Sequence, residues 1–507
     1  MPGGEIQLSA IGQQDGFLTS NPDISFFKAV YKRYTPFAQQ LIELDDDTNN
    51  NTLSSFDKTY TLKYKIPRNA DLLKEIYLQV TLPAIYSNDT QQFQWIERLG
   101  EYMIQEIRII GDDSRVYHRL RSEYLHIYAE THIPESKKYD YYAMTGNLPE
   151  YYDPANGGSN RGIYPGQSKP TSGATTGIPS IPQIDLTIPI PFWFSQHSGC
   201  ALPLVALQYM SLRIEVDVRP LYHLYTIIDT EPSNATFGKR IRPDPLNSEH
   251  YLNVFTNVAN GNTLSSTNVN LFGNYIFLDR DERKRFAQNE HMYLMRDVQY
   301  FTDVTENIGG GNLTLDLKDI NHPVTQLYFM LRRTDNELSN QWNNYTLWEY
   351  QDGKLVNPLN KNFISQYNNQ LVISDTTTYD AIDMTNYDLI KNVEMRLEGQ
   401  ARFDRQNISF FKANRYHHNK ESSSEAMKGI YGYSFSLEND KYQPSGSCNF
   451  SRLGSKELSF TLKDLSLTRY PRRGGLTFTG DYRIFVIAEN INFYRVLSGM
   501  SGKVFDN

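Results

Sequence analysis

Alternation of apolar and polar residues recurs along this chain and constrains its fold more than any other feature. In residues 212–219 one set of alternate positions is apolar and the other is charged: Leu212, Ile214, Val216 and Val218 against Arg213, Glu215, Asp217 and Arg219. Successive side chains of a β-strand point to opposite faces, so this pattern predicts a strand with one buried and one solvated face. The same alternation recurs in residues 58–67, 75–83, 312–317 and 457–462. It is typical of antiparallel sheets.

One segment departs from this pattern because it is apolar on both faces. Residues 482–491, YRIFVIAENI, predict a central strand that is covered on both faces. The composition agrees with a β-rich chain, since 36 Tyr and 26 Phe are many for 507 residues and aromatic side chains suit a pleated surface. We therefore expect an all-β fold with few short helices.

The first helix that we expect lies in residues 18–38, LTSNPDISFFKAVYKRYTPFA. Asn21 would cap it and Pro22 would occupy its first turn, while Phe and Tyr recur at helical spacing. Lys28 and Lys32 would lie on the opposite side.

A second helix is expected in residues 118–132, HRLRSEYLHIYAETH. Glu123, His126 and Glu130 would share one of its faces. Glu-x-x-His occurs in carboxylate-bridged di-metal sites, but those sites need a four-helix bundle that this chain does not offer. We therefore predict a solvated helix face without a metal ion.

Three long segments predict surface loops, namely residues 133–183, 228–270 and 334–388. A weak internal repeat relates residues 189–218 to residues 433–462 and places Cys200 and Cys448 in corresponding loops. The repeat favours two domains of one architecture, and the jelly roll suits such strands.

The chain is thus predicted to form two tandem antiparallel jelly-roll β-sandwiches with long surface loops. The expected parts are an N-terminal arm with a short helix (1–35), a first jelly roll (36–222), a linker (223–270) and a second jelly roll (271–507).

Charge and motifs exclude several functions. A formal net charge of -8 argues against binding nucleic acid or an anionic membrane through bulk charge. No secretory signal and no apolar run of ~18–20 residues is visible, and two distant cysteines indicate a reducing compartment. The mixed charges of residues 278–287, LDRDERKRFA, indicate a turn or helix start rather than a phosphate site. We find no catalytic, cofactor-binding or metal-binding motif, and we expect no enzyme.

Six segments, taken in order, resemble the major capsid protein of the nucleocytoplasmic large DNA viruses. They are residues 14–38, 191–216 (PFWFSQHSGCALPLVALQYMSLRIEV), 275–288 (YIFLDRDERKRFAQ), 321–329 (NHPVTQLYF), 429–453 and 489–507. The resemblance implies two tandem jelly rolls and a homotrimer of pseudo-hexagonal outline that tiles an icosahedral shell. It implies minor capsid protein partners, an internal membrane, no direct nucleic-acid contact and no small-molecule substrate. It also implies a virion protein that is made and assembled in the host cytoplasm.

The resemblance suggests a role for the aromatic and basic arm. An inward docking surface for minor capsid proteins or lipid head groups is expected at Phe26, Phe27, Lys28, Tyr31, Lys32 and Arg33. The alternative is that these aromatic residues belong to the domain's own core and that the basic residues face water.

Two other functions stay open from the sequence. One is a minor or scaffold-like capsid paralogue, because copy number is not encoded in motifs. The other is a jelly-roll protein that binds or hydrolyses carbohydrate, because the separation of paired carboxylates cannot be read from a sequence.

Overall fold

The computed structural model describes most of the chain in two units, Met1–Phe37 and Ala38–Asn507. The described residues are 3–47, 52–53, 59–87, 91–158, 160, 164–168, 177–229, 240–256, 264–305, 311–346, 388–419, 427–463 and 481–505. Much of the predicted loop 334–388 therefore lies outside the described residues.

The N-terminal unit contains two short helices, α1 (Gly3–Ser9) and α2 (Gln13–Thr19), and the helix expected in residues 18–38 is wrong. Residues 20–36, all of them described, contain no helix. Asn21 has φ 51°, which is left-handed, whereas an N-cap residue is extended. No described residue of 3–37 is buried. A short amphipathic helix gains most of its stability from packing its apolar face, so the aromatic spacing alone does not form one.

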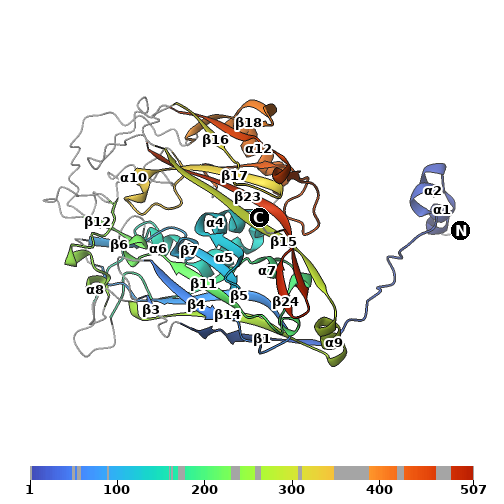
Figure 1. Cartoon of the computed structure of the whole chain (residues 1–507), viewed down its shortest axis with the longest axis horizontal. Coiled ribbons are helices and arrows are strands. Elements are labelled where there is room, and N and C mark those ends of the chain that lie inside the picture. The colour runs from blue at the N-terminus through green and yellow to red at the C-terminus, as the bar shows by residue number, and fades with distance from the viewer. Residues whose placement is uncertain are drawn as a thin grey trace. The chain divides into compact units, whose positions relative to one another are not determined.

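Three sheets form the first jelly roll (Figure 1). Sheet 1 contains β1 (Phe37–Glu43), β14 (Leu264–Leu278), β5 (Leu72–Leu82) and β10 (Leu202–Pro203), with β3 (Thr52–Leu53) beside β14 and β9 (Ile184–Ile190) beside β5. Sheet 2 contains β2 (Asp45–Asp46), β4 (Tyr60–Lys65), β11 (Leu212–Val218), β7 (Ile104–Gly111) and β8 (Val116–Arg121). Sheet 3 contains β13 (Arg240–Ile241), β12 (Tyr225–Asp229) and β6 (Gln91–Trp95).

Two sheets form the second jelly roll. Sheet 4 contains β15 (His291–Thr305), β23 (Tyr482–Leu497), β17 (Pro323–Arg333) and β20 (Ile430–Ser434), with β21 (Cys448–Asn449) beside β17 and β24 (Met500–Lys503) beside β23. Sheet 5 contains β16 (Asn312–Asp316), β22 (Lys456–Leu462), β18 (Ile390–Leu397) and β19 (Gln400–Asn407).

Both rolls repeat one pattern of antiparallel pairing. The order β1-β14-β5, with β9 and β10 on β5, matches the order β15-β23-β17, with β20 and β21 on β17. Likewise β4-β11-β7-β8 matches β16-β22-β18-β19. Cys200 closely precedes β10 and Cys448 opens β21, so the two loops related by the sequence repeat hold equivalent places. The prediction of two tandem jelly-roll sandwiches is confirmed.

Helices and short 3-10 turns connect these strands. Within the described residues of the second unit, the α-helices are α3 (Leu99–Met103), α4 (Ser122–His132), α5 (Glu135–Thr145), α6 (Pro149–Tyr152), α7 (Trp193–Gln196), α8 (Leu252–Phe255), α9 (Arg280–Gln288), α10 (Thr334–Glu337) and α12 (Ile408–His418). The 3-10 turns in the same described residues are η1 (Ser198–Cys200), η2 (Leu204–Ala206), η3 (Leu221–His223), η4 (Ser248–His250) and η6 (Phe450–Arg452).

Two predicted loops contain regular structure. The segment 133–183 includes α5 and α6, so its prediction as a loop is wrong in that part. Strands β12 and β13 and the first part of β14 lie within the predicted linker 223–270, and they pair within the sheets of the first roll. The helix start predicted in residues 278–287 is confirmed, because α9 begins there with Asp279 as its N-cap.

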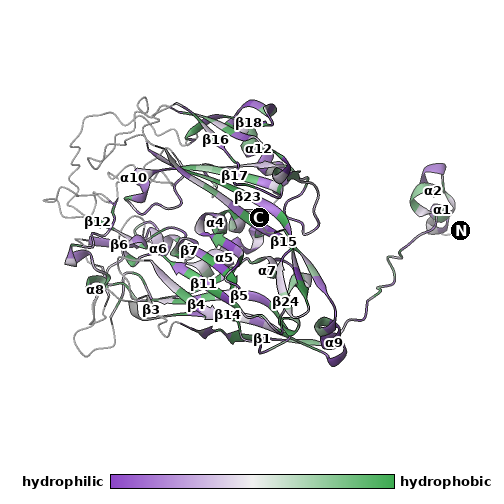
Figure 2. Ribbon diagram, in the orientation of Figure 1, coloured by the Kyte–Doolittle hydropathy of each residue, from purple (hydrophilic) through white to green (hydrophobic). Residues whose placement is uncertain are grey.

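Sheet 4 is apolar on both faces and joins the two rolls. Along β17 and β23, alternate residues pack into the core of the second roll: Leu327, Phe329, Leu331, Ile484, Val486 and Ala488. The residues between them pack into the core of the first roll: Tyr328, Met330, Phe485 and Ile487. Figure 2 shows hydrophobic residues along these strands. The predicted covered central strand is thus confirmed, and we call sheet 4 the shared sheet.

We expect a truncation in the shared sheet to destabilise both rolls together. Ile487 is 1% exposed and faces the first roll, so Ile487→Ala should lower the free energy of unfolding by about 2–5 kcal/mol. Thermal and urea unfolding should still show a single transition. Lys391→Ala, at an exposed position of β18, is the control and should change little. Two separate transitions, only one of which moves, would contradict this account.

Candidate functional site

The arm carries the docking residues predicted from the sequence, and the structure leaves them exposed. Phe26, Phe27 and Tyr31 are 90%, 98% and 85% exposed, and Lys28, Lys32 and Arg33 are exposed as well. They lie within eight consecutive residues but outside any helix, so they form an irregular segment rather than a stripe. Aromatic rings left in water are free to bind a partner.

A second group of functional residues lies around α4, whose polar face was predicted to be solvated. That prediction is wrong, because Glu123 is 6% exposed and His126 and Glu130 are fully buried. Cations from other elements account for this burial. Arg98 contacts Glu130 through Nη2 at 2.5 Å, and Lys138 of α5 contacts the same carboxylate at 3.3 Å.

The pKa values of two buried carboxyl groups near Arg98 are shifted in opposite directions. Burial is the largest single influence on Glu130 and would raise its pKa, but the charges of Arg98 and His126 and the hydrogen bonds from Tyr142 and Arg98 together lower that pKa to about 2. Burial prevails at Glu101 and raises its pKa to about 7 against the charge of Arg98. Arg98 lies 3.4 Å from Glu101 and 2.5 Å from Glu130, so we expect Glu130 to be its charged partner at neutral pH.

A loop of the second roll packs against the first roll through Trp342. The indole Nε1 donates to the carbonyl oxygen of His223 at 3.0 Å. The guanidinium groups of Arg219 and Arg332 lie 4.3 Å and 5.4 Å from the Trp342 ring, a cation–π arrangement. Asn340 adds two hydrogen bonds to carbonyl oxygens of the first roll. Arg219, predicted to point into solvent, thus turns inward over an aromatic ring.

Helix α4 lies across the shared sheet and contacts three of its strands. Arg332 of β17 lies 3.7 Å from Glu123, and Arg296 of β15 donates to His132 Nε2 at 3.3 Å. Burial raises the pKa of Glu489 on β23, and an interaction of Tyr124 with this carboxyl group lowers that pKa by a smaller amount. We call this contact between α4 and the outer face of the shared sheet the seam. Its polar pairs fix the orientation that apolar packing alone leaves adjustable.

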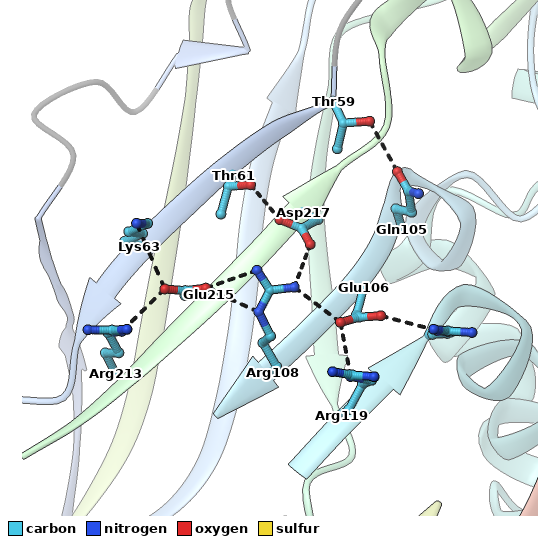
Figure 3. Close-up of polar contacts among 11 residues, drawn as sticks. Thr59, Thr61, Lys63, Gln105, Glu106, Arg108, Arg119, Arg213, Glu215 and Asp217 are labelled. Atoms are coloured by element: carbon cyan, nitrogen blue, oxygen red, sulfur yellow. Dashed lines mark hydrogen bonds and ion pairs between the residues drawn. The ribbon is translucent and has the colours of Figure 1, made fainter. Parts of the chain in front are cut away.

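The outer face of sheet 2 carries a network of charged side chains (Figure 3). Three carboxylates lie at its centre and five cationic side chains surround them: Glu106, Glu215 and Asp217, with Lys63, Arg108, Arg119, Arg121 and Arg213. Arg108 bridges Glu215 at 2.9 Å, Asp217 at 2.7 Å and Glu106 at 3.1 Å. Because each acid is already paired and largely buried beneath the cations, we interpret this face as a structural wall rather than a binding site.

None of these clusters has the form of a catalytic or metal centre. Among the described residues, no group of three or more His, Cys, Asp or Glu side chains could hold a metal ion. Within that same part of the chain, no helix combines the length and the apolar character needed to cross a membrane. The arrangement holds two β-sandwiches in one rigid orientation and exposes an aromatic arm, which are the properties of a structural building block.

Comparison with known proteins shows to which family this chain belongs. Two family models cover nearly the whole chain: the major capsid protein N-terminus matches residues 25–279, and the large eukaryotic DNA virus major capsid protein matches residues 282–502. The chain belongs to the major capsid protein family of large eukaryotic DNA viruses. It is therefore a structural protein and not an enzyme, as its sequence predicted.

Curated relatives match over their full length. The major capsid protein of Phaeocystis pouchetii virus is 27% identical over 567 residues, with 100% of both chains covered. The major capsid protein of Paramecium bursaria Chlorella virus 1 is 26% identical over 530 residues, again with 100% of both covered.

Solved structures agree on the fold. A quasi-atomic model of the PBCV-1 virus capsid aligns with TM-score 0.65 at 22% identity and covers 95% of this chain and 100% of that one. The Faustovirus major capsid protein aligns with TM-score 0.60 at 13% identity, over 95% and 94% of the two chains. The predicted resemblance to this family is thus confirmed, and so is the double jelly-roll fold.

The seam predicts a loss of stability on acidification. Burial, reinforced by the charge of Arg296, lowers the pKa of His132 to about 3, below the unfolded value of about 6.5. Below pH 6.5 the unfolded chain therefore binds this proton more readily. The contribution of neutral His132 to stability is full above about pH 6.5 and is lost as the pH falls towards 3.

We expect His132→Gln to reduce the fall in melting temperature between pH 7 and pH 5, by a few degrees, whatever its effect at pH 7. The control is His197→Gln at an exposed position, which should keep the wild-type pH dependence. Equal pH dependence in both variants would show that His132 does not titrate across the seam. Differential scanning fluorimetry at pH 5, 6 and 7 provides the comparison.

Proposed function

We propose that three copies of this chain associate into a six-sided capsomer, and that these capsomers tile the icosahedral shell of a double-stranded DNA virus. The observation that carries the proposal is the repeated roll. One chain holds two sandwiches of equivalent strand pairing, joined through the shared sheet, so three chains supply six similar sandwiches. Head-to-tail contacts that close on themselves form rings, and this ring needs only three subunits.

Different parts of the chain would have different roles in the capsomer. We propose that residues 1–35 form the inward arm, and that the boundary between the rolls lies at α9 rather than in residues 223–270. Strand pairing supports that position, since β14 pairs within the first roll and β15 within the second. The break between the two matching family models, after residue 279 and before residue 282, falls at the same place.

A role in the capsid shell suggests the remaining partners of this chain. The proposed partners are other capsomers, minor capsid proteins and possible membrane head groups beneath the shell, with synthesis and assembly in the host cytoplasm. The exposed aromatic and basic side chains of residues 26–33 support the arm as the contact to those inner partners, because rings and cations together suit acidic or amphipathic surfaces.

The oligomeric state tests the capsomer directly. Light scattering coupled to size exclusion should give three times the chain mass of 58.6 kDa for the purified protein. An obligate interface of this kind should bury about 2,000 Å² or more, so the trimer should persist on dilution into the nanomolar range. A stable monomer at assembly concentrations would contradict the proposal.

Charge reversal tests the arm separately. The triple variant Lys28→Glu, Lys32→Glu and Arg33→Glu should form trimers of normal mass and stability but should fail to enter particles. A charge-matched control reverses three exposed lysines elsewhere, Lys137, Lys284 and Lys391, and should be incorporated normally. Normal incorporation of the arm variant, judged by its band intensity in purified particles, would remove the docking role.

A further inference from the structure

Helices α4 and α12 hold equivalent places in the two rolls but differ in what covers them. Each contains 11 residues, begins directly after an edge strand (β8 or β19) and precedes the strand β9 or β20. Counting from the first residue, positions three, six and ten are Tyr124, Ile127 and Thr131 in α4. The same positions in α12 are Phe410, Ala413 and His417.

The stripe of α4 is buried in the seam. Tyr124 is 1% and Ile127 and Thr131 are 0% exposed. Tyr124 interacts with Glu489, and Thr131 with Tyr328, on the outer face of the shared sheet. These three positions of α4 therefore pack against a sheet face.

The stripe of α12 is left exposed, and among the described residues no sheet face buries it as the shared sheet buries the stripe of α4. Phe410 is 41% exposed, and Ala413 and His417 are exposed as well. The three residues lie on one side of the helix by their spacing of three and four. An exposed phenylalanine in the place of a buried tyrosine indicates a surface that is covered in an assembly.

Sheet 1 offers the face that corresponds to the outer face of the shared sheet. The sixth residue of β5 is Tyr77 and the sixth residue of β17 is Tyr328, and both strands begin with a pair to the equivalent short strand, β10 or β21. Tyr77 pairs with Phe272 of β14, as Tyr328 pairs with Ile487 of β23. Tyr77 and Phe272 are only half-buried, as is Gln79 on the same face.

We propose that the α12 stripe of one copy (Phe410, Ala413 and His417) covers the outer face of β5 and β14 of the next copy. The contact repeats between copies what the seam does within one chain. This inference rests on the proposed trimer and names its interface. The in-chain contact joins the first roll to the second, and the new contact joins the second roll to the first roll of a neighbour, so three copies close the ring.

Exposed charges near the two surfaces are complementary. Glu43 at the end of β1 and Asp185 of β9 are exposed carboxylates in the sheet that would receive the helix. Arg405, three residues before α12, is an exposed cation at the other surface. Opposite charges on the two partners favour this pairing over the pairing of two identical surfaces.

One variant tests the interface by disrupting it. Ala413→Glu places a charge in the middle of the stripe, and glutamate suits an exposed helix position, so the monomer should fold normally. We expect the concentration at which trimers dissociate to rise by about tenfold or more. The control is Leu246→Glu, at a residue that is 93% exposed and lies outside both surfaces, and it should leave the trimer unchanged.

A second measurement tests the contact without weakening it. Gln79→Cys and Ala413→Cys are made in separate chains, co-expressed and treated with a bis-maleimide linker of about 10 Å. Linked dimers of the two different chains are expected, and each variant alone is the control for reaction through Cys200 or Cys448. Failure of the mixed assembly to link overturns the inference even if Ala413→Glu weakens the trimer.

The outcomes separate this inference from the proposed function. A wild-type trimer that survives Ala413→Glu and does not link through residues 79 and 413 keeps the capsomer but assigns its interface elsewhere. A wild-type chain that stays monomeric overturns the capsomer itself, and the interface with it. A trimer that dissociates on Ala413→Glu and links in the mixed assembly supports both.

Discussion

The shared sheet is the constraint on which the rest of this structure depends. A sheet with one apolar face completes one sandwich, but alternate residues of β17 and β23 enter two different cores. Neither roll can therefore move away from the other without exposing a whole apolar sheet face to water. This geometry makes two sandwiches one rigid body, and rigidity is what a shell needs from a unit that must meet its neighbours at fixed angles.

The polar groups of the seam add direction to this apolar contact. Apolar packing tolerates small rotations, whereas His132 beside Arg296 in the seam fits one orientation, and so does Trp342 between Arg219 and Arg332 next to the seam. Their burial has a cost, because each charge needs a partner once water is excluded. In the seam, each buried charge has a partner on another element, and these partners come from α4, β15 and β17. A change in the orientation of the two rolls would therefore leave several buried charges unpaired at once.

The sequence predicts the strands and the repeat because alternation and strand spacing are local properties. Residues 212–219 and 482–491 carry their own burial pattern, whichever strands they pair with. The seam could not be predicted in the same way. Glu123, His126 and Glu130 look like a solvated face in isolation, and only the fold brings distant cations, Arg98 and Arg332, to bury them. The aromatic spacing of residues 26–34 failed for the opposite reason, since the arm buries none of its described residues.

The two edge strands at equivalent places, β8 and β19, are protected in different ways, and the difference follows from what covers them. The Tyr300 hydroxyl of the shared sheet accepts from the backbone N–H of Arg121 and donates to the carbonyl of Arg119, so these two backbone groups of β8 are already bonded within the chain. Strand β19 is largely exposed and carries Arg402, Asp404 and Arg405, and charged side chains discourage strand addition. Strand addition at β19 is therefore disfavoured, and in the proposed trimer a neighbour would meet β19 and α12 through side chains, as a closed ring requires.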